Sequence, residues 1–574
     1  MQPSADQNGS TAAGSGLRRW GPIVAIVAVL AIVGGVVAMS GGDDDGDGTT
    51  DTTADGGTDD GIAGGEGAIS FSQAQADGTL DELTFPASCD PDTGLVSMPN
   101  SLAPECYANV EDNGGATSPG VTADTIKVVV YLAPESDPVL DFITAPINAD
   151  DTNEQIKATY QGFVDMFNAT YQTYGRTVEL EFLDGSGLSQ DEVQARADAV
   201  KAMEELGAFA VWGGPVLSNA WTEEIKARGG VCLGCPGLRD AAPSVFTITP
   251  TASQIRQHFV EYLSKKLAGK PAEHAGDESM HSTERVFGQL YIDTGSQDVQ
   301  DGLAETQELL DAAGIEFVEK IGYELDPGTL AEQASTAIAR LQEAGVTTVI
   351  IGGDPIAPKT FTEIATQQGY RPEWVLNGAA LQDTTAFGRT YDQDQWSHAF
   401  GISTLAARAA NGLGDAERLY QWWTGEYPPA DDAVGVLYPN PAMFFRGLQA
   451  AGPNLTVESF RDGMFAVEPT PPAVTHQIIT FGDHGIWDAE DYAGIDDFTE
   501  LWWDPTVAGP DEIRKDGVGM YRYVDGGKRY LLGDWPDDLR VFDPDGTTTV
   551  YQELPPGEEP ADVPPFPGSP AAGG

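Results

Sequence analysis

From residue 121 onward the chain switches repeatedly between two hydrophobic periods, and this alternation limits the folds open to it. Short runs of consecutive apolar residues, typical of buried strands, alternate with longer segments in which apolar residues recur every three or four positions, as in amphipathic helices. Turn-forming residues stand at the switches. Strands that alternate with helices in this order form parallel sheets covered by helices on both faces. The sequence therefore predicts an α/β fold.

The alternation occurs in two series, separated by a polar stretch at residues 269–283. In the first series we expect strands at 126–132, 177–183, 209–212, 231–233 and 245–249, and helices at 153–174, 191–206, 218–228 and 253–267. In the second we expect strands at 286–292, 315–323, 348–351 and 374–376, and helices at 299–313, 329–344 and 358–368. Two such units predict two lobes. Beyond them we expect helices near 416–425 and 441–451, followed by a Trp- and Pro-rich stretch with no sheet of its own.

The segment at residues 21–39 has nineteen residues and no charge. A secretory signal usually has a shorter apolar core, whereas a membrane helix needs about 20 residues, so we expect a retained transmembrane helix. Arg18 and Arg19 precede it and the next basic residue is Lys127, which predicts a cytoplasmic N-terminus and an extracellular main body. A cleaved signal peptide remains the alternative, because small residues surround Met39.

The chain is strongly acidic, with 89 Asp and Glu against 30 Lys and Arg, a formal net charge of −59. Such a charge repels phosphate backbones, so nucleic acid is excluded as a partner. Nine of the acids lie at residues 41–66, a stretch with no base and few large apolar side chains. This composition predicts a disordered acidic linker after the membrane segment.

The four cysteines lie beyond the membrane segment, where an oxidising environment favours disulfides. Cys89 and Cys106 bracket a short loop that contains Pro and Gly, and we expect them to be bonded. Cys232 and Cys235 form a C-x-x-C pair that Pro236 and Gly237 follow, with no helix beginning there. A structural disulfide or a buried thiol pair is therefore favoured over redox catalysis, which stays open as an alternative.

The chain has none of the G-x-S-x-G, G-x-x-x-x-G-K-[ST], H-E-x-x-H or helix-opening G-x-G-x-x-G motifs that mark several enzyme classes. The densest group of histidines and acids lies around His274 and His281 in a hydrophilic loop, which favours solvation over metal binding. We accordingly expect no catalytic residue, no metal and no cofactor.

Polar and glycine-rich segments follow three of the predicted strands, where ligands bind in open parallel sheets. Residues 213–219, which include Gly214, Ser218 and Asn219, offer backbone N–H groups, a helix N-terminus and a hydroxyl, a combination that suits a carboxylate. An ordinary helix cap is an equally good interpretation. In the second unit, Thr294 and Asp354 follow strands in the same way. The carboxylates of this unit could meet an ammonium or a hydroxyl.

Several segments resemble the type 1 periplasmic-binding proteins of the branched-chain amino acid class, in their actinobacterial extracytoplasmic form. They are GVTADTIKVVVY at residues 120–131, preceded by NGGAT at 113–117, then LAGKPAEHAGD at 267–277 and TERVFG at 283–288. The resemblance spans about residues 85–505. It implies a two-lobed Venus-flytrap fold, each lobe a parallel sheet flanked by helices, that delivers small solutes to an ABC permease and its ATPase.

The resemblance also implies a ligand site. Ser218 and Asn219 would hold a ligand carboxylate together with backbone amides, and Pro134 and Glu135, after the first strand, would complete the pocket with Thr294 and Asp354. It places the segments that cross between the lobes near Pro250, at 377–378 and at 403–405, with a return to the second lobe near the end of the core.

These inferences divide the chain as follows: a cytoplasmic N-terminus at 1–20, the membrane helix at 21–39, the acidic linker at 40–83, a disulfide-containing collar at 84–120, lobe 1 at 121–250 and 379–470, lobe 2 at 251–378 and 471–505, a C-terminal extension at 506–554 and a disordered tail at 555–574. The expected function is capture of an amino acid, amide or related carboxylate for an ABC transporter at the cell membrane. A membrane-tethered sensor or scaffold without a transport role is the alternative.

Overall fold

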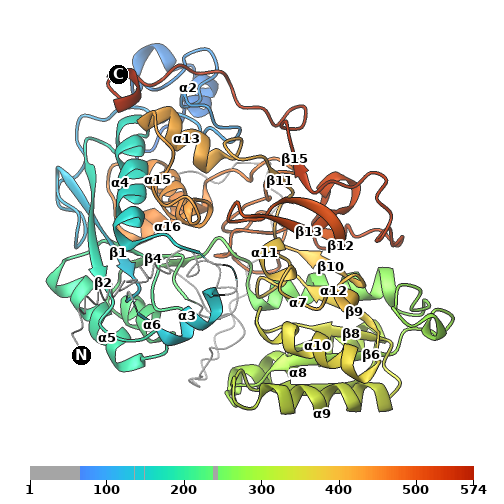
Figure 1. Ribbon diagram of the computed structural model, residues 1–574. Helices are drawn as coiled ribbons and strands as arrows, with labels where there is room; N and C mark the ends of the chain where they lie inside the picture. The colour runs from blue at the N-terminus through green and yellow to red at the C-terminus, as the bar shows by residue number, and fades with distance from the viewer. Residues whose placement is uncertain (1–64, 135, 146, 148, 237–243, 574) are drawn as a thin grey trace, which may run out of the picture.

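The computed structural model describes residues 65–573 apart from residues 135, 146, 148 and 237–243. Two sheets, one parallel and one mainly parallel, form two lobes side by side (Figure 1). None of the helices within these ranges is both long and apolar enough to cross a membrane. The predicted membrane helix at 21–39 and most of the predicted linker lie outside the described residues, whereas residues 71–77 of that linker form helix α2 (Phe71–Asp77).

Lobe 1 has a five-stranded sheet in the order β2-β1-β3-β4-β5, and all of its strands are parallel. Its strands are β1 (Thr125–Leu132), β2 (Thr177–Asp184), β3 (Ala210–Trp212), β4 (Val231–Leu233) and β5 (Val245–Phe246). The helices between them are α3 (Pro138–Thr144), α4 (Asn153–Thr170), α5 (Glu192–Val200), which a π-helical turn (Lys201–Glu205) continues, and α6 (Ala220–Ala227). The predicted strands and helices of this lobe are confirmed with small shifts at their ends.

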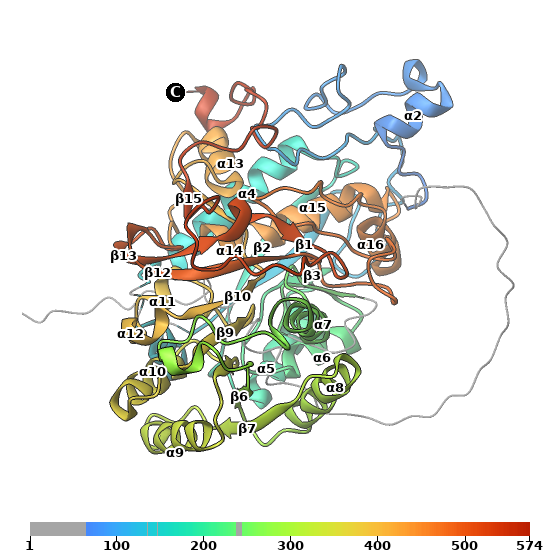
Figure 2. The same cartoon turned by 90° about the vertical axis from the view of Figure 1, so that its right-hand side faces the viewer.

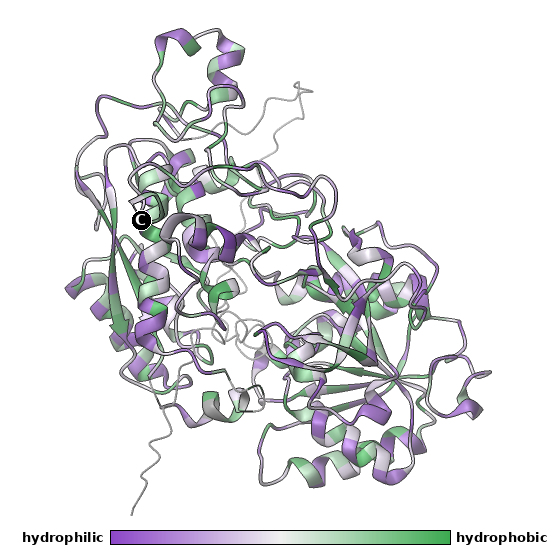
Figure 3. Ribbon diagram, turned by 45° about the horizontal axis from the view of Figure 1, so that its top comes forward, coloured by the Kyte–Doolittle hydropathy of each residue, from purple (hydrophilic) through white to green (hydrophobic). Residues whose placement is uncertain are grey.

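Helices cover both faces of the lobe 1 sheet. Apolar side chains of α5 and α6 pack on one face, and those of α4 pack on the other together with helices that return from later in the chain. The returning helices are α13 (Asp415–Thr424), α14 (Val434–Leu437), α15 (Pro439–Ala451) and α16 (Val457–Phe465). Hydrophobic residues are concentrated in the strands of both sheets, while the surrounding helices and loops carry many hydrophilic ones (Figure 3).

Lobe 2 has an eight-stranded sheet in the order β13-β12-β10-β9-β8-β6-β7, with β14 paired to β12. Its strands are β6 (Phe287–Ile292), β7 (Phe317–Tyr323), β8 (Thr348–Ile351), β9 (Glu373–Asn377), β10 (Ala399–Ser403), β12 (Phe498–Pro510), β13 (Asp516–Tyr523) and β14 (Arg529–Tyr530). Its helices are α7 (Ala252–Tyr262), α8 (Gln297–Ala313), α9 (Leu330–Glu343), α10 (Ala357–Gln368), α11 (Thr385–Gly388) and α12 (Gln393–Trp396). Strands β6 to β10 are parallel, and β12 and β13 add an antiparallel edge.

Residues 379–403 belong to lobe 2, although the sequence placed them in lobe 1. Strand β10 pairs with β9 on one side and with β12 on the other, so it lies inside the second sheet. Gly401 interrupts its short apolar run and weakens the strand signal in the sequence. Hydrogen bonds from both neighbouring strands nevertheless fix it as a strand.

The C-terminal region is built into the fold rather than appended to it. The Trp-rich stretch that we expected to lack a sheet forms β12, and the predicted extension at 506–554 continues through β13 and β14. The ribbon of β12 and β13 lies between the lobe 1 helices and the rest of lobe 2 in two perpendicular views (Figures 1 and 2). Residues 555–573, which we expected to be disordered, contact two parts of the fold: Glu558 accepts from the Val474 N–H over 3.0 Å, and the Trp422 indole of α13 donates to the Pro564 carbonyl over 2.8 Å.

Candidate ligand-binding site

The loop between β3 and α6, residues 213–219, shows how the lobe 1 site is built. A Cβ atom on Gly214 would lie 2.6 Å from Cδ1 of Trp221, so only glycine fits there. The Ser218 hydroxyl is buried and accepts a hydrogen bond of 3.2 Å from the Ala220 N–H, at the start of α6. Asn219 precedes the helix without capping it, and its buried Oδ1 has no hydrogen-bond partner. Asn219 therefore keeps an unused acceptor, while Ser218 is partly committed to the helix.

The loop after β1 lies beside this one, because β1 pairs with β3. Pro134 is half-buried at the end of β1, and Glu135 lies outside the described residues. Two positions further on, Asp137 is fully buried and accepts from the Ser189 N–H over 2.7 Å. This bond joins the loop after β1 to the loop after β2.

The start of α4 adds two residues that the sequence analysis missed. Asp151 is buried; the Ala433 N–H donates to its Oδ2 over 2.7 Å, and its Oδ1 has no partner. Burial, reinforced by the nearby carboxylate of Asp432, raises the pKa of Asp151 to about 7. Asn153 donates to the Ala133 carbonyl at the end of β1 over 3.3 Å and leaves its own Oδ1 unpaired. The predicted helix at 153–174 and the capping-box pattern of Thr152 and Gln155 both mark this helix start, but neither signal shows that Asp151 and Asn153 keep unpaired acceptors.

In lobe 2, Thr294 follows β6 and is exposed. Its hydroxyl donates to the Ser296 Oγ over 2.9 Å, and Ser296 in turn caps α8 by accepting from the Val299 N–H. The Thr294 side chain therefore stands at the edge of the sheet with its surface open.

Asp354, after β8, has a different environment from the one we expected. Its Oδ1 accepts from the N–H groups of Ile356 and Ala357, each over 2.7 Å, and its Oδ2 accepts from the Tyr323 hydroxyl over 2.5 Å. Burial raises its pKa above the usual value, and these hydrogen bonds act in the opposite direction. Oδ1 therefore holds the start of α10 and Oδ2 is bonded to Tyr323 at the end of β7, so Asp354 shapes the strand end without presenting a free carboxylate.

The predicted residues thus form two groups, one in each lobe. Gly214, Ser218 and Asn219 share an edge of the first sheet with Pro134, and Thr294 and Asp354 share an edge of the second, where β6 pairs with β8. Within the described part of the chain, no hydrogen bond joins one group to the other.

Among the residues that the structure describes, three segments cross between the lobes, at residues 247–251, 404–414 and 466–497. The first and third are joined by backbone hydrogen bonds, including one of 2.7 Å from the Gly494 N–H to the Thr247 carbonyl. The second and third are joined by a bond of 3.0 Å from the Ala407 N–H to the Val474 carbonyl. Crossings near Pro250 and at 403–405 agree with this arrangement, but one at 377–378 does not, because the chain stays in lobe 2 after β9.

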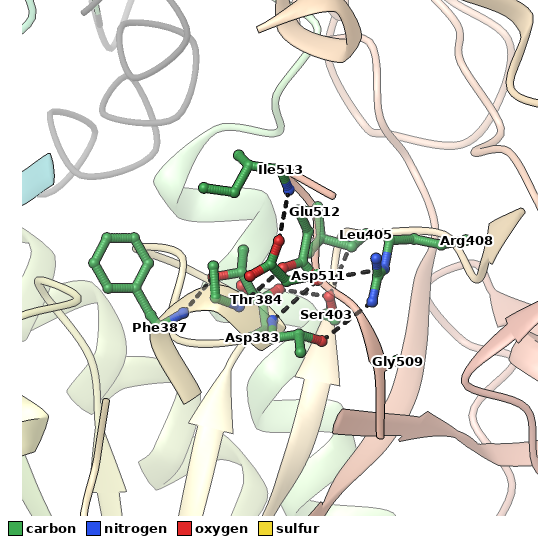
Figure 4. A network of polar contacts seen from close by, with 12 residues as sticks. Asp383, Thr384, Phe387, Ser403, Leu405, Arg408, Gly509, Asp511, Glu512 and Ile513 are labelled. Carbon is green, nitrogen blue, oxygen red and sulfur yellow. Dashed lines mark hydrogen bonds and ion pairs between the residues drawn. The ribbon is translucent and has the colours of Figure 1, made fainter. Parts of the chain in front are cut away.

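A turn of five residues, 511–515, joins β12 to β13, and we call it the hairpin tip. Glu512 accepts from the N–H groups of Thr385 and Ala386, each over 3.0 Å, and lies 3.4 Å from the Arg408 guanidinium (Figure 4). Beside them Ser403, at the end of β10, donates to buried Asp383 (Figure 4). Arg389 donates to the carbonyls of Gly509, Lys515, Gly517 and Gly519. These bonds fix the hairpin tip to lobe 2 and to the second crossing segment.

The hairpin tip also reaches lobe 1. Arg514 pairs with Glu417 of α13, with Nε donating to Oε1 over 2.9 Å, and donates to the Asp431 carbonyl. Lys515 lies 3.5 Å from the Asp432 carboxylate. A pair of charged contacts therefore ties the two lobes together outside the three crossing segments.

Both predicted cysteine pairs are disulfides: Cys89–Cys106 in the collar, and Cys232–Cys235, which joins β4 to the turn after it. Cys232 and Cys235 are almost completely buried. A disulfide that solvent and other thiols cannot reach fits a structural role better than redox exchange.

Two open α/β sheets joined by three crossing segments define a two-lobed protein of the hinged, ligand-enclosing class. Residues 139–488 match the model of the periplasmic binding protein family. Since these residues are more than half of the 574 in the chain, the protein belongs to that family. The resemblance noted in the sequence is confirmed at the level of the family.

Solved structures with a similar fold share little sequence with this chain. The branched-chain amino acid transporter substrate-binding protein LivJ of Streptococcus pneumoniae, in complex with isoleucine, is 14% identical with a TM-score of 0.44, over 70% of this chain and 100% of its own. A fatty acid ABC transporter substrate-binding protein of Thermomonospora curvata is 15% identical with a TM-score of 0.48, over 74% and 99%. A solute-binding protein of Rhodopseudomonas palustris, in complex with 4-hydroxybenzoate, is 13% identical with a TM-score of 0.48, over 72% and 99%. No curated protein matches this chain in sequence.

Proposed function

We propose that this protein is the extracytoplasmic solute-binding component of an ABC uptake transporter, and that it captures a small polar solute such as an amino acid, an amide or a related carboxylate. The observation that carries the proposal is membership of the periplasmic binding protein family in a chain whose two sheets end in polar loops and are joined by three crossing segments. The solute would lie between the loop at 213–219 and the loop around Thr294. The protein would perform no reaction on it.

Capture would work by closure of the hinge. A solute that contacts both lobes gains interactions that only the closed arrangement offers, so binding shifts the population toward closure. In lobe 1 the unpaired acceptors of Asn219, Asn153 and Asp151 lie at or beside the ends of β1 and β3 and suit a solute with N–H or O–H donors. The backbone N–H groups of the 213–219 loop suit a carboxylate at the same edge.

The partners would be a membrane permease and its ATPase, with the closed lobes presented to the permease. The uncharged segment at 21–39 would anchor the protein in the cell membrane, and residues 40–64 would serve as the linker between this anchor and the lobes. The two lobes would then lie outside the cell, where both disulfides remain oxidised.

A ligand screen by thermal unfolding tests the proposal. Amino acids, amides and small carboxylates are added singly to the full chain, and a solute that binds the folded state raises the melting temperature. We expect at least one class to do so, and Asn219→Ala and Thr294→Ala to weaken that solute's binding by about tenfold, equivalent to about 1.4 kcal/mol. Thr336→Ala is the matched control, since Thr336 is an exposed threonine on α9 with a hydroxyl bonded only within its helix. A screen in which every class leaves the melting temperature unchanged would count against solute capture.

A further inference from the structure

A cavity of about 360 Å³ lies between the returning helices of lobe 1, the three crossing segments and the C-terminal region. Ile248 lines it from the first crossing segment, residues 409, 413 and 414 from the second, and residues 467, 475–477 and 479–481 from the third. Arg514 of the hairpin tip, Leu554 and Glu558 close it. We call the site at the ends of the strands, proposed above for the solute, the strand-end site. This cavity is separate from it, because its lining includes none of Pro134, Gly214, Ser218, Asn219, Thr294 and Asp354.

One face of α15 forms a wall of the cavity. Pro439, Ala442, Met443 and Arg446 line it, and their spacing of three or four residues places them on one side of the helix. Apolar side chains from α14, α16 and the third crossing segment, such as those of Val434, Met464 and Ile479, continue the surface. The walls are therefore mainly apolar, with Arg446 at one end of the helical face.

The carboxylates that line the cavity already have partners. Asp415 pairs with Arg418, and Glu417 pairs with Arg514. Glu558 accepts from the N–H groups of Val474 and Thr475, each over 3.0 Å. None of these acids is paired with Arg446.

Of the arginines that line the cavity, Arg418 and Arg514 form ion pairs and Arg446 differs from them. It donates to the Leu102 carbonyl, and its charge and a hydrogen bond to the Tyr171 hydroxyl partly offset the rise that burial causes in the pKa of Tyr171. Within the described part of the chain it has no ion pair with a carboxylate, although acids outnumber bases in the whole sequence by 89 to 30. A guanidinium has five N–H donors, so Arg446 keeps donors for an additional acceptor.

We propose that this cavity is a second ligand-binding site, selective for a compact carboxylate with an apolar body. The carboxylate would accept two hydrogen bonds from Arg446, which a planar guanidinium offers in the right geometry. The apolar body would lie along Met443 and Met464, whose unbranched side chains adapt to different shapes. The cavity volume falls at the lower end of the range for small-molecule sites, about 300 to 1,000 Å³.

Calorimetric titration of the full chain with octanoate tests this site, with octan-1-ol as the probe that keeps the tail and loses the charge. We expect saturable binding of octanoate, at least tenfold weaker binding of octan-1-ol, and at least tenfold weaker octanoate binding in Arg446→Gln. Arg461→Gln is the matched control, because Arg461 lies on neighbouring α16 and does not line the cavity. Ala442→Phe is a second variant, which fills the cavity without removing Arg446 and is also expected to abolish binding.

Four results would overturn the proposal. The first is the absence of saturable octanoate binding to the wild-type chain, and the second is equal affinity for octanoate and octan-1-ol. The third is unchanged octanoate affinity in a folded Arg446→Gln or Ala442→Phe variant. The fourth is a loss of octanoate affinity in Asn219→Ala. The last result would assign octanoate to the strand-end site. Since Asn219→Ala and Thr294→Ala report on the strand-end site and Arg446→Gln reports on the cavity, the two proposals fail separately.

Discussion

The ion pair between Arg514 and Glu417 gives a direct test of how the C-terminal hairpin affects lobe movement. Arg514 belongs to the lobe 2 ribbon and Glu417 to α13 of lobe 1, and only 15% and 11% of their side-chain surfaces are exposed. Arg514→Gln would remove the charge, the contact with Glu417 and the bond to the Asp431 carbonyl. The arrangement with the lobes in contact would lose this interaction, and an arrangement with the lobes apart does not contain it. The substitution should therefore shift the population toward separated lobes.

The magnitude follows from the burial of the pair. Exposed ion pairs contribute about 0 to 1 kcal/mol, and loss of one partner from a fully buried pair costs about 3 to 5 kcal/mol. With roughly an eighth of each side chain exposed, we take an intermediate value of about 2 kcal/mol. That free energy corresponds to about a 30-fold change in the equilibrium between the two lobe arrangements.

Small-angle X-ray scattering measures this change as a larger radius of gyration in Arg514→Gln than in the wild-type chain. Glu417→Gln should give a similar shift, and the double variant should give less than the sum because the two residues form one contact. Arg340→Gln is the control: Arg340 pairs with Glu319 on the surface of lobe 2, where 51% of the arginine side chain is exposed. Identical scattering from Arg514→Gln, Arg340→Gln and the wild type would refute the reasoning.

Three further predictions concern stability. Arg285 and Glu373 form a fully buried bidentate ion pair, with Nε to Oε2 at 2.7 Å and Nη2 to Oε1 at 2.9 Å. Arg285→Met should therefore lower the free energy of unfolding in urea by about 3 to 5 kcal/mol. Arg340→Met, which breaks an exposed pair, should lower it by less than about 1 kcal/mol. Burial raises the pKa of Asp151 from 3.8 to about 7, so its protonated form stabilises the fold below about pH 4 and that contribution is lost as the pH rises through 7. In urea titrations between pH 4 and 7, Asp151→Asn should lose less stability than the wild-type chain. An identical pH profile for the two proteins would contradict this raised pKa. Replacing both cysteines of a disulfide by serine should lower the free energy of unfolding by about 3 kcal/mol for Cys89–Cys106, which are 17 residues apart, and by about 2 kcal/mol for Cys232–Cys235, which are 3 apart. Equal losses, or a larger loss for Cys232–Cys235, in urea unfolding would rule out loop closure as the main cause.

The alternating hydrophobic pattern was enough to predict the two sheets, because strands such as β4 and β8 are continuous apolar runs between helices with a clear apolar face. It failed at β10, which is short and contains Gly401, and at β12 and β13, whose buried stretches are rich in aromatic and charged residues. These strands are fixed by pairing with distant partners, and a local period does not carry that information.

The sequence located the ends of the strands but could not assign the roles of their side chains. Asp354 and Ser218 are polar residues after predicted strands, yet each is engaged by N–H groups at the start of the next helix. Asp151 and Asn153 were overlooked because they lie some twenty residues after β1, at the start of α4, which only the fold brings beside the end of that strand. Whether a strand-end side chain caps a helix or stays unpaired depends on the exact geometry of the loop, which residue type alone does not determine.

The hairpin tip extends this argument to the regulation of the hinge. The family match ends at residue 488, whereas the ribbon of β12 and β13 begins at Phe498. Arg389 and Glu512 hold the tip to lobe 2, and Arg514 holds it to lobe 1, so relative movement of the lobes must strain or break the contact with Glu417. Arg514 and Glu417 also line the cavity of about 360 Å³ proposed above as a second ligand-binding site. A region beyond the family match therefore contributes both a tie between the lobes and a wall of the proposed second site, so we expect changes in the hairpin tip to alter lobe opening and carboxylate binding together.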